Sequence, residues 1–143
     1  MSENKEFEVT FSGALSSEVR REHYKSGDYI FFEGDIDQHF YIIEEGSIQI
    51  FTKNAQGQRL DISIIEPGES FGELALLDSR ARSASAQAAE DCTLIKVSAR
   101  GYEQLLSELP GWASSMLHSF ARRLKHTTEL LQAAPQFLPG QKK

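Results

Sequence analysis

Short β-rich segments at nearly regular spacing, between residues 27 and 97, restrict the fold of this chain more than any other feature of its sequence. Turn signals rich in glycine, aspartate and asparagine separate them, as in Glu33-Gly34-Asp35. Two further strand candidates lie between Ser85 and Val97. Strands at roughly ten-residue spacing are typical of an antiparallel sandwich or jelly roll. The four clearest segments, rich in β-branched and aromatic residues, are 29–32, 40–43, 48–51 and 60–65.

The sequence on either side of this region predicts helices. A polar N-terminal segment, 1–26, contains one short helix candidate over 14–21. Residues 27–98 are expected to form the jelly roll, 99–133 a hinge with C-terminal helices, and 134–143 an aperiodic tail. We therefore expect one domain that is mainly β with flanking helices: an antiparallel jelly-roll (double-stranded β-helix) barrel. The hinge helix is predicted by apolar residues at helical spacing, Tyr102, Leu105, Leu106 and Leu109, and ends before Pro110.

The second helix, from about 111 to 133, has an apolar stripe at the spacing of a coiled-coil seam. Two interpretations stay open: the stripe pairs two copies of the chain, or it packs on the barrel of its own chain. Another face of the helix carries Trp112 and Met116, which we expect in the core. The stripe consists of Leu117, Phe120, Leu124, Thr127 and Leu131.

Composition excludes several functional classes. The net charge of −6 argues against a surface that coats nucleic acid or anionic membrane. A single cysteine, Cys92, excludes an internal disulfide framework and a cysteine zinc site, and we expect its side chain to be buried. The four histidines lack metal-binding spacing, so neither a metal nor another cofactor is expected. Neither a secretion signal nor a membrane span is evident, which favours the cytoplasm.

Residues 71–86 contain the pattern most suggestive of chemistry. Phe71-Gly72-Glu73 precedes good helix formers, and a helix N-terminus offers unpaired N–H groups to an anion. Glycine there lets a ligand approach the backbone. Arg82, in a run of small residues, adds a guanidinium suited to phosphate, while the Glu73 carboxylate suits vicinal hydroxyls. These groups describe a sugar-phosphate pocket; the alternative is a surface turn in which Glu73 pairs with Arg80 or Arg82.

The segment resembles the phosphate-binding cassette of the cyclic nucleotide-binding domain family. The motif is Phe71-Gly72-Glu73-Leu74-Ala75-Leu76-Leu77, followed after a spacer by Arg82-Ser83-Ala84-Ser85. Segments 27–35, 40–48, 89–95 and 121–124 also resemble the family, so the likeness covers nearly the whole chain. The resemblance implies a β-roll with a short helical turn in the cassette and a long C-terminal helix.

The resemblance also implies residue roles. Glu73 would bind the ribose 2′-hydroxyl and Arg82 the exocyclic phosphate oxygens. In the catabolite-activator branch a hydroxyl pair on the long helix contacts adenine, and Thr127 and Thr128 stand at that place. The remaining implied contacts are backbone groups of Gly72, Leu74 and Ala75, the Ser83 hydroxyl, and a pocket wall of Ile50, Ile62 and Ser63.

Two departures from the family pattern bear on the ligand. Ala81 replaces a proline that often precedes the arginine, which removes no ligand contact. Ser83 replaces an alanine of kinase regulatory domains; a hydroxyl there occurs in relatives that bind cAMP and in relatives that bind cGMP. Thr127 and Thr128 favour cAMP, and cGMP stays open.

The sequence therefore predicts a non-enzymatic cyclic nucleotide sensor in which ligand binding moves the C-terminal helix. We expect a cyclic mononucleotide and an unidentified downstream protein as partners, without direct contact to nucleic acid or membrane. With only 134–143 after the long helix, the chain is expected to be a stand-alone domain or a regulatory fragment of a larger transcription factor, channel or kinase. The alternatives are a module with the same fold that binds no ligand, and a metal-dependent, cupin-like catalyst.

Overall fold

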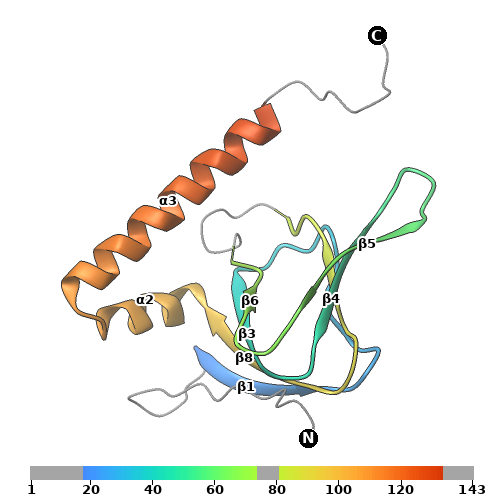
Figure 1. Cartoon of the computed structure of the whole chain (residues 1–143), viewed down its shortest axis with the longest axis horizontal. Helices are drawn as coiled ribbons and strands as arrows, with labels where there is room; N and C mark the ends of the chain where they lie inside the picture. The colour runs from blue at the N-terminus through green and yellow to red at the C-terminus, as the bar shows by residue number, and fades with distance from the viewer. Residues whose placement is uncertain (1–17, 74–80, 134–143) are drawn as a thin grey trace, which may run out of the picture. The chain divides into compact units, whose positions relative to one another are not determined.

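The computed structural model describes residues 18–73 and 81–133. The chain divides into two compact units that meet at Leu109 (Figure 1). The first unit contains the strands β1 (Val19–Tyr24), β2 (Tyr29–Phe31), β3 (His39–Glu45), β4 (Ile48–Lys53), β5 (Arg59–Ile65), β6 (Ser70–Phe71), β7 (Ser85–Ala88) and β8 (Cys92–Ser98), and the helix α2 (Ala99–Ser107). The second contains the helix α3 (Gly111–Ala133).

The strands form two antiparallel four-stranded sheets, in the orders β1-β8-β3-β6 and β2-β7-β4-β5. Neighbours in each sheet are mostly distant in the sequence, as in β1 with β8, where Val19 pairs with Val97. The exception is the long hairpin of β4 and β5, which Figure 1 shows at the edge of its sheet. This crossing topology is that of a jelly roll, and the predicted fold class is confirmed.

A hydrophobic core fills the space between the two sheets. Ile48 of β4 lies in this core cluster with its ladder partner Ala88, and Phe51 of the same strand is also buried, 3% exposed. Tyr41 and Phe71 stack at 5.1 Å between ring centroids, and Phe31 lies 6.0 Å from each of them. This aromatic group anchors the ends of β2, β3 and β6 at the place where the site lies.

Helix α2 covers a second, smaller cluster outside the sheet of β1, β8 and β3. Phe40, Ile95 and Val97 are buried there, with Tyr102 and Leu105 of the helix packed against them. Ser98 caps the helix by accepting a hydrogen bond from the Gly101 amide. The predicted apolar stripe therefore packs on the roll within α2, which ends at Ser107.

The structure corrects the prediction for the N-terminal segment. Val19, Arg20 and Arg21, predicted at the end of a helix over 14–21, belong to strand β1, and 14–17 lie outside the described residues. Pairing along the length of β8 satisfies the backbone of β1, and burial of Val19 under α2 fixes its register. Tertiary pairing thus outweighs local helix propensity here.

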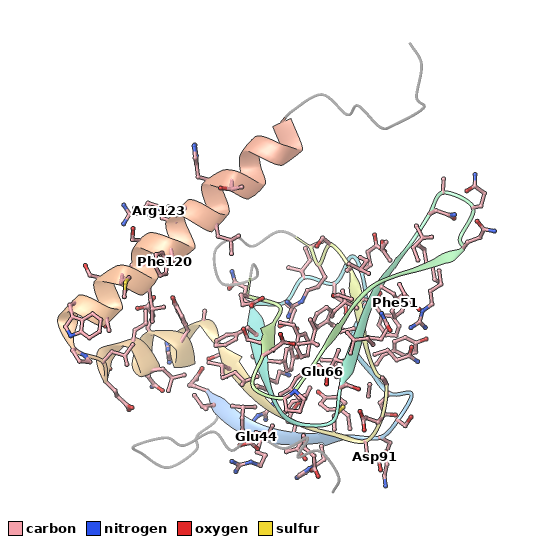
Figure 2. The ribbon with its side chains drawn as sticks, viewed as in Figure 1. Glu44, Phe51, Glu66, Asp91, Phe120 and Arg123 are labelled. Atoms are coloured by element: carbon pink, nitrogen blue, oxygen red, sulfur yellow. The ribbon has the colours of Figure 1, made fainter. Side chains whose placement is uncertain are left out.

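Helix α3 has the predicted bounds, but its large side chains are exposed. Trp112 is 71% exposed and Met116 44%, so their prediction as core residues is wrong. Apart from Leu109 and Pro110, the described part of the second unit consists of this one helix, which leaves these side chains without a packing partner within it. Leu117, Phe120 and Leu124 of the predicted seam are exposed as well, and Figure 2 labels Phe120. In the part of the chain that the structure describes, neither helix is long and apolar enough to cross a membrane.

Candidate functional site

The site lies where the end of β6 meets the loop that leads into β7. Phe71 ends β6 in the core, and Gly72 turns the chain with φ +82°. Ser83 and Ala84 then approach β7, whose Ser85 hydroxyl accepts a hydrogen bond from the Glu33 amide at 2.8 Å. These contacts hold the two cassette ends that the structure describes against β2 and β3.

Arg82 is the central side chain of the site. It is only 7% exposed, and its guanidinium lies over the Phe31 ring, 4.0 Å from the centroid. Nη2 donates to the His39 carbonyl at 2.7 Å and to Asp37 Oδ2 at 3.2 Å, and Nη1 donates to the Gly72 carbonyl at 3.2 Å. Nε is buried and has no hydrogen-bond partner among the described residues. The side chain is therefore fixed in direction, with its Nε donor unused.

A buried guanidinium requires a counter-ion, and Asp37 provides it. Burial on its own would raise the pKa of the Asp37 carboxyl. Hydrogen bonds from His39 and Arg82, together with the charge of both groups, outweigh burial and hold that pKa below its usual value. The carboxylate is thus held in its charged form, hydrogen-bonded to both the arginine and the histidine.

Gly72 is required by the arginine itself. A Cβ at this position would lie 2.9 Å from Arg82 Nη1 and 3.4 Å from the His39 carbonyl oxygen. The positive φ is also a conformation that other residues adopt only with strain. The sequence motif predicted a glycine for close approach of a ligand; the structure adds that the glycine makes room for the guanidinium.

Glu73 lies at the rim of the site. Its side chain is exposed, and Oε2 accepts a hydrogen bond from the Ser70 hydroxyl at 2.8 Å. Arg82 is bound to Asp37 instead, so a surface pair of Glu73 with Arg82 does not describe this turn. The other partner considered for Glu73, Arg80, lies outside the described residues.

A cavity of about 170 Å³ opens beside Arg82. It brings together several of the predicted site residues with core aromatics of the roll. A buried cation with an unused N–H donor at the wall of such a cavity can bind an anionic oxygen, and the exposed carboxylate at the rim can accept hydrogen bonds from hydroxyl groups. The lining residues are Phe31, Ile50, Phe71, Gly72, Glu73, Arg82, Ser83 and Ala84.

Other predicted site residues are placed differently. Ser63 is the ladder partner of Ile50, so both project from the same face of the sheet. Ile62 lies at the adjacent irregularity in β5 and is 58% exposed. Leu74 and Ala75 fall outside the described residues. Thr127 is exposed on α3, in the second unit, and the side chain of Thr128 lies outside what the structure describes, so their role in base contact stays a prediction.

Sequence reasoning missed Asp37 and His39. Asp37 lies in the polar segment between β2 and β3, where acidic residues ordinarily indicate a turn, and His39 is the first residue of β3. Neither belongs to the cassette motif, and only the approach of β3 to the 82–84 loop brings them to Arg82. Nothing in the local sequence indicates that contact.

A larger cavity, of about 370 Å³, lies away from Arg82 at the other end of β8. Its lining includes acidic and basic side chains together, such as Lys25, Glu45 and Asp91 (Figure 2 labels Asp91). The described residues contain no group of three potential metal ligands. Because this cavity has no buried unpaired donor or acceptor, we assign the candidate site to the smaller cavity.

Comparison with known proteins gives consistent matches. The model of the family described as "Cyclic nucleotide-binding domain" matches residues 21–108. The "Cyclic AMP receptor protein" of Thermus thermophilus is 38% identical over 109 residues, which are 76% of this chain and 50% of the relative. The chain therefore spans about half the length of this relative.

Solved structures give the same result for the fold. The Thermus thermophilus catabolite activator protein superposes with a TM-score of 0.65 at 36% identity, over 81% of this chain and 55% of that one. The regulatory domain of Toxoplasma gondii PKA, crystallised with cAMP, gives 0.60 at 26% identity, over 74% of this chain and 40% of that one. On the family match, the curated relative and the shared roll, this chain belongs to the cyclic nucleotide-binding domain family.

Proposed function

We propose that this domain binds a cyclic mononucleotide, with cAMP as the preferred ligand, and that it is a regulatory rather than a catalytic module. The single observation that carries the proposal is Arg82: a buried, fixed guanidinium with Nε unused, at the wall of a cavity. Arginine in this state is suited to the exocyclic oxygens of a cyclic phosphate. Glu73 at the rim accepts a hydrogen bond from the ribose 2′-hydroxyl.

The proposed preference for cAMP has its own support, separate from that for binding. It is supported by the name of the Thermus relative, a cyclic AMP receptor protein, and by the PKA domain crystallised with cAMP. The hydroxyl pair Thr127 and Thr128 supports it from the sequence. cGMP is the competing ligand, and the binding experiment below includes it.

The output of binding is proposed to be a movement of α3. A ligand favours one arrangement of two units only if it interacts differently with each arrangement. Phosphate and ribose would bind the roll, and the base would bind α3 through Thr127. The exposed stripe of Leu117, Phe120 and Leu124 would then pair with the same stripe of a second copy. The downstream partner would read the position of the paired helices.

The test is calorimetric titration with cAMP, cGMP and a cyclic dinucleotide. Arg82→Gln is compared with Arg59→Gln, a matched control, because Arg59 also lies over a phenylalanine ring, 3.8 Å from the Phe51 centroid. We expect Arg82→Gln to weaken cAMP binding by about 2 kcal/mol or more, roughly thirtyfold in Kd, because a charge-assisted contact is lost. Arg59→Gln should bind as the unaltered protein does.

Glu73→Gln keeps the test decisive if Arg82→Gln fails to fold, since Glu73 is exposed. Circular dichroism of each variant identifies loss of folding. Equal binding by the Arg82 and Arg59 variants would refute the site. Absence of heat with every cyclic nucleotide, from a folded protein, would favour the alternative that the roll is an interaction module without ligand.

A further inference from the structure

Behind the proposed phosphate site, three charged or ionisable side chains form a continuous chain of contacts. His39 Nδ1 lies 2.5 Å from Asp37 Oδ1, and Asp37 Oδ2 accepts from Arg82 Nη2 at 3.2 Å. The two oxygens of one carboxylate thus link a histidine to the buried arginine. Both Asp37 and His39 are partly exposed, so solvent reaches these two side chains while Arg82 stays buried.

The Asp37 carboxylate has two opposite effects on a ligand phosphate. It fixes the guanidinium through Nη2, which favours binding, and it places a negative charge beside the cation that the phosphate needs. Within 18–73 and 81–133, Asp37 provides the only ion pair recorded for Arg82. Any change that offsets the charge of Asp37 therefore increases the attraction of Arg82 for an anion without moving the guanidinium.

His39 is the group that can make this change. Its protonated ring places a positive charge against Asp37 Oδ1, and histidine changes its charge between pH 5 and 8. We propose that Asp37 and His39 are positioning residues of the phosphate site, and that protonation of His39 tightens the binding of an anionic ligand at Arg82. The inference rests on the proposed function, since it concerns the affinity of the same site.

Other groups around His39, Asp37 and Arg82 do not reverse the proposed effect of His39 protonation on anion binding. On the core side lies Tyr41, a phenol that stays neutral because burial raises its pKa far above the physiological range. Across the ladder His39 faces Ser98 of β8, whose hydroxyl is bonded to the Glu18 carboxylate. In the preceding turn, the Asp35 carboxylate accepts from the Phe32 amide at 2.9 Å.

Proton binding at His39 and anion binding at Arg82 are coupled in both directions. If a proton on His39 strengthens anion binding, then the bound anion strengthens proton binding by the same factor. A cyclic phosphodiester keeps its negative charge between pH 5 and 8, so its own titration does not contribute. Through-space charge interactions of this kind, partly screened by water, predict an affinity roughly fivefold higher at about pH 5.5 than at about pH 8.

The experiment measures the Kd for cAMP by calorimetry across this pH range at constant ionic strength, in buffers free of phosphate. His39→Gln is compared with His23→Gln, because His23 is an exposed strand histidine on β1 that contacts Thr93 at 3.1 Å and is remote from the cassette. We expect a flat pH profile for His39→Gln and an unchanged slope for His23→Gln. Asp37→Asn should bind more tightly than the unaltered protein at pH 8 and respond less to pH.

The possible results separate failure of the inference from failure of the proposed function. Binding of cAMP whose pH dependence is absent, or survives in His39→Gln, overturns the inference and leaves the proposed function intact. Weaker binding by Asp37→Asn at every pH would overturn the charge-offset role of Asp37. If no variant and no pH gives binding from folded protein, the proposed function fails and the inference with it.

Discussion

Arg82 is almost fully buried, which is rare for a charged side chain. Its neighbours compensate for the loss of water: an aromatic face, two carbonyl groups and one carboxylate. Removing a partner from a buried charge is much more costly than removing an exposed pair. The proposed binding depends on Arg82, and the stability of the buried guanidinium depends on Asp37.

The lowered pKa of Asp37 predicts a specific dependence of stability on acid. A carboxyl group whose pKa is lower in the folded state stabilises the fold above its unfolded-state pKa, and the stabilisation disappears as pH falls through the folded-state pKa. We expect Asp37→Asn to lower the free energy of unfolding by about 1–3 kcal/mol at pH 7, as for one charged partner of a buried pair. The difference should shrink as pH falls below the ordinary pKa of an aspartate and disappear once pH has passed below the lowered pKa of folded Asp37.

Urea unfolding at a series of pH values measures this difference. Asp61→Asn is the control, because Asp61 forms an exposed ion pair with Arg59 at 2.8 Å, and exposed pairs contribute little. A difference for Asp37→Asn that is the same at pH 7 and in acid would show that packing, rather than charge, underlies the effect.

Sequence reasoning was effective for residues whose chemistry depends on their immediate neighbours. Gly72, Glu73, Arg82 and Ser83 share one short motif and line one cavity. Asp37 and His39 contribute through contacts between segments far apart in the chain, which a motif does not encode. Gly72 was identified, but the need to accommodate Arg82 Nη1 became evident only from coordinates.

At the scale of elements, the strands followed from their turn signals and β-branched residues, and the boundary between the two C-terminal helices followed from Pro110. The exception was β1, because local helix propensity at 14–21 gives no information on the edge of β8 with which that segment pairs. A strand at the edge of a sheet is determined by its partner, and the partner lies about seventy residues away in the sequence, from Tyr24 with Cys92 to Val19 with Val97.

Helix α2 is held on the roll by an unusually close backbone contact. A Cβ at Gly101 would lie 2.4 Å from the Glu18 carbonyl oxygen and 3.0 Å from the Val19 side chain. We expect Gly101→Ala to destabilise the first unit by about 1–3 kcal/mol, because the helix must move away from β1. Thermal unfolding followed by circular dichroism measures this change.

Gly111→Ala is the matched control at the start of α3. A Cβ there meets no heavy atom within 4 Å, and alanine is the better helix former, so stability should be unchanged or slightly higher. Equal stability of the Gly101 and Gly111 variants would mean that α2 can shift without cost, and that its contact with the start of β1 contributes little.

For the whole molecule, the sequence predicted a long final helix and left its partner open. The structure confirms the bounds of α3 and leaves its apolar side chains exposed, including Phe120, which Figure 2 labels beside the charged Arg123. Helices of this kind obtain most of their stability from packing of an apolar face. The identity of that packing surface decides how a signal from the roll would be transmitted.

Leu124→Glu tests the proposed pairing of α3 with a second copy. In a seam, an unpaired buried carboxylate costs several kcal/mol, so the variant should dissociate at concentrations at least about a hundredfold higher than the unaltered protein. Sedimentation across a dilution series measures this shift. Arg123→Glu places the same side chain one residue away, outside the predicted stripe, and should leave the dimer intact. A monomeric mass for all three proteins, with loss of thermal stability in Leu124→Glu alone, would mean instead that the stripe packs on its own chain. That result would require the base contact and the movement of α3 to operate within a single molecule.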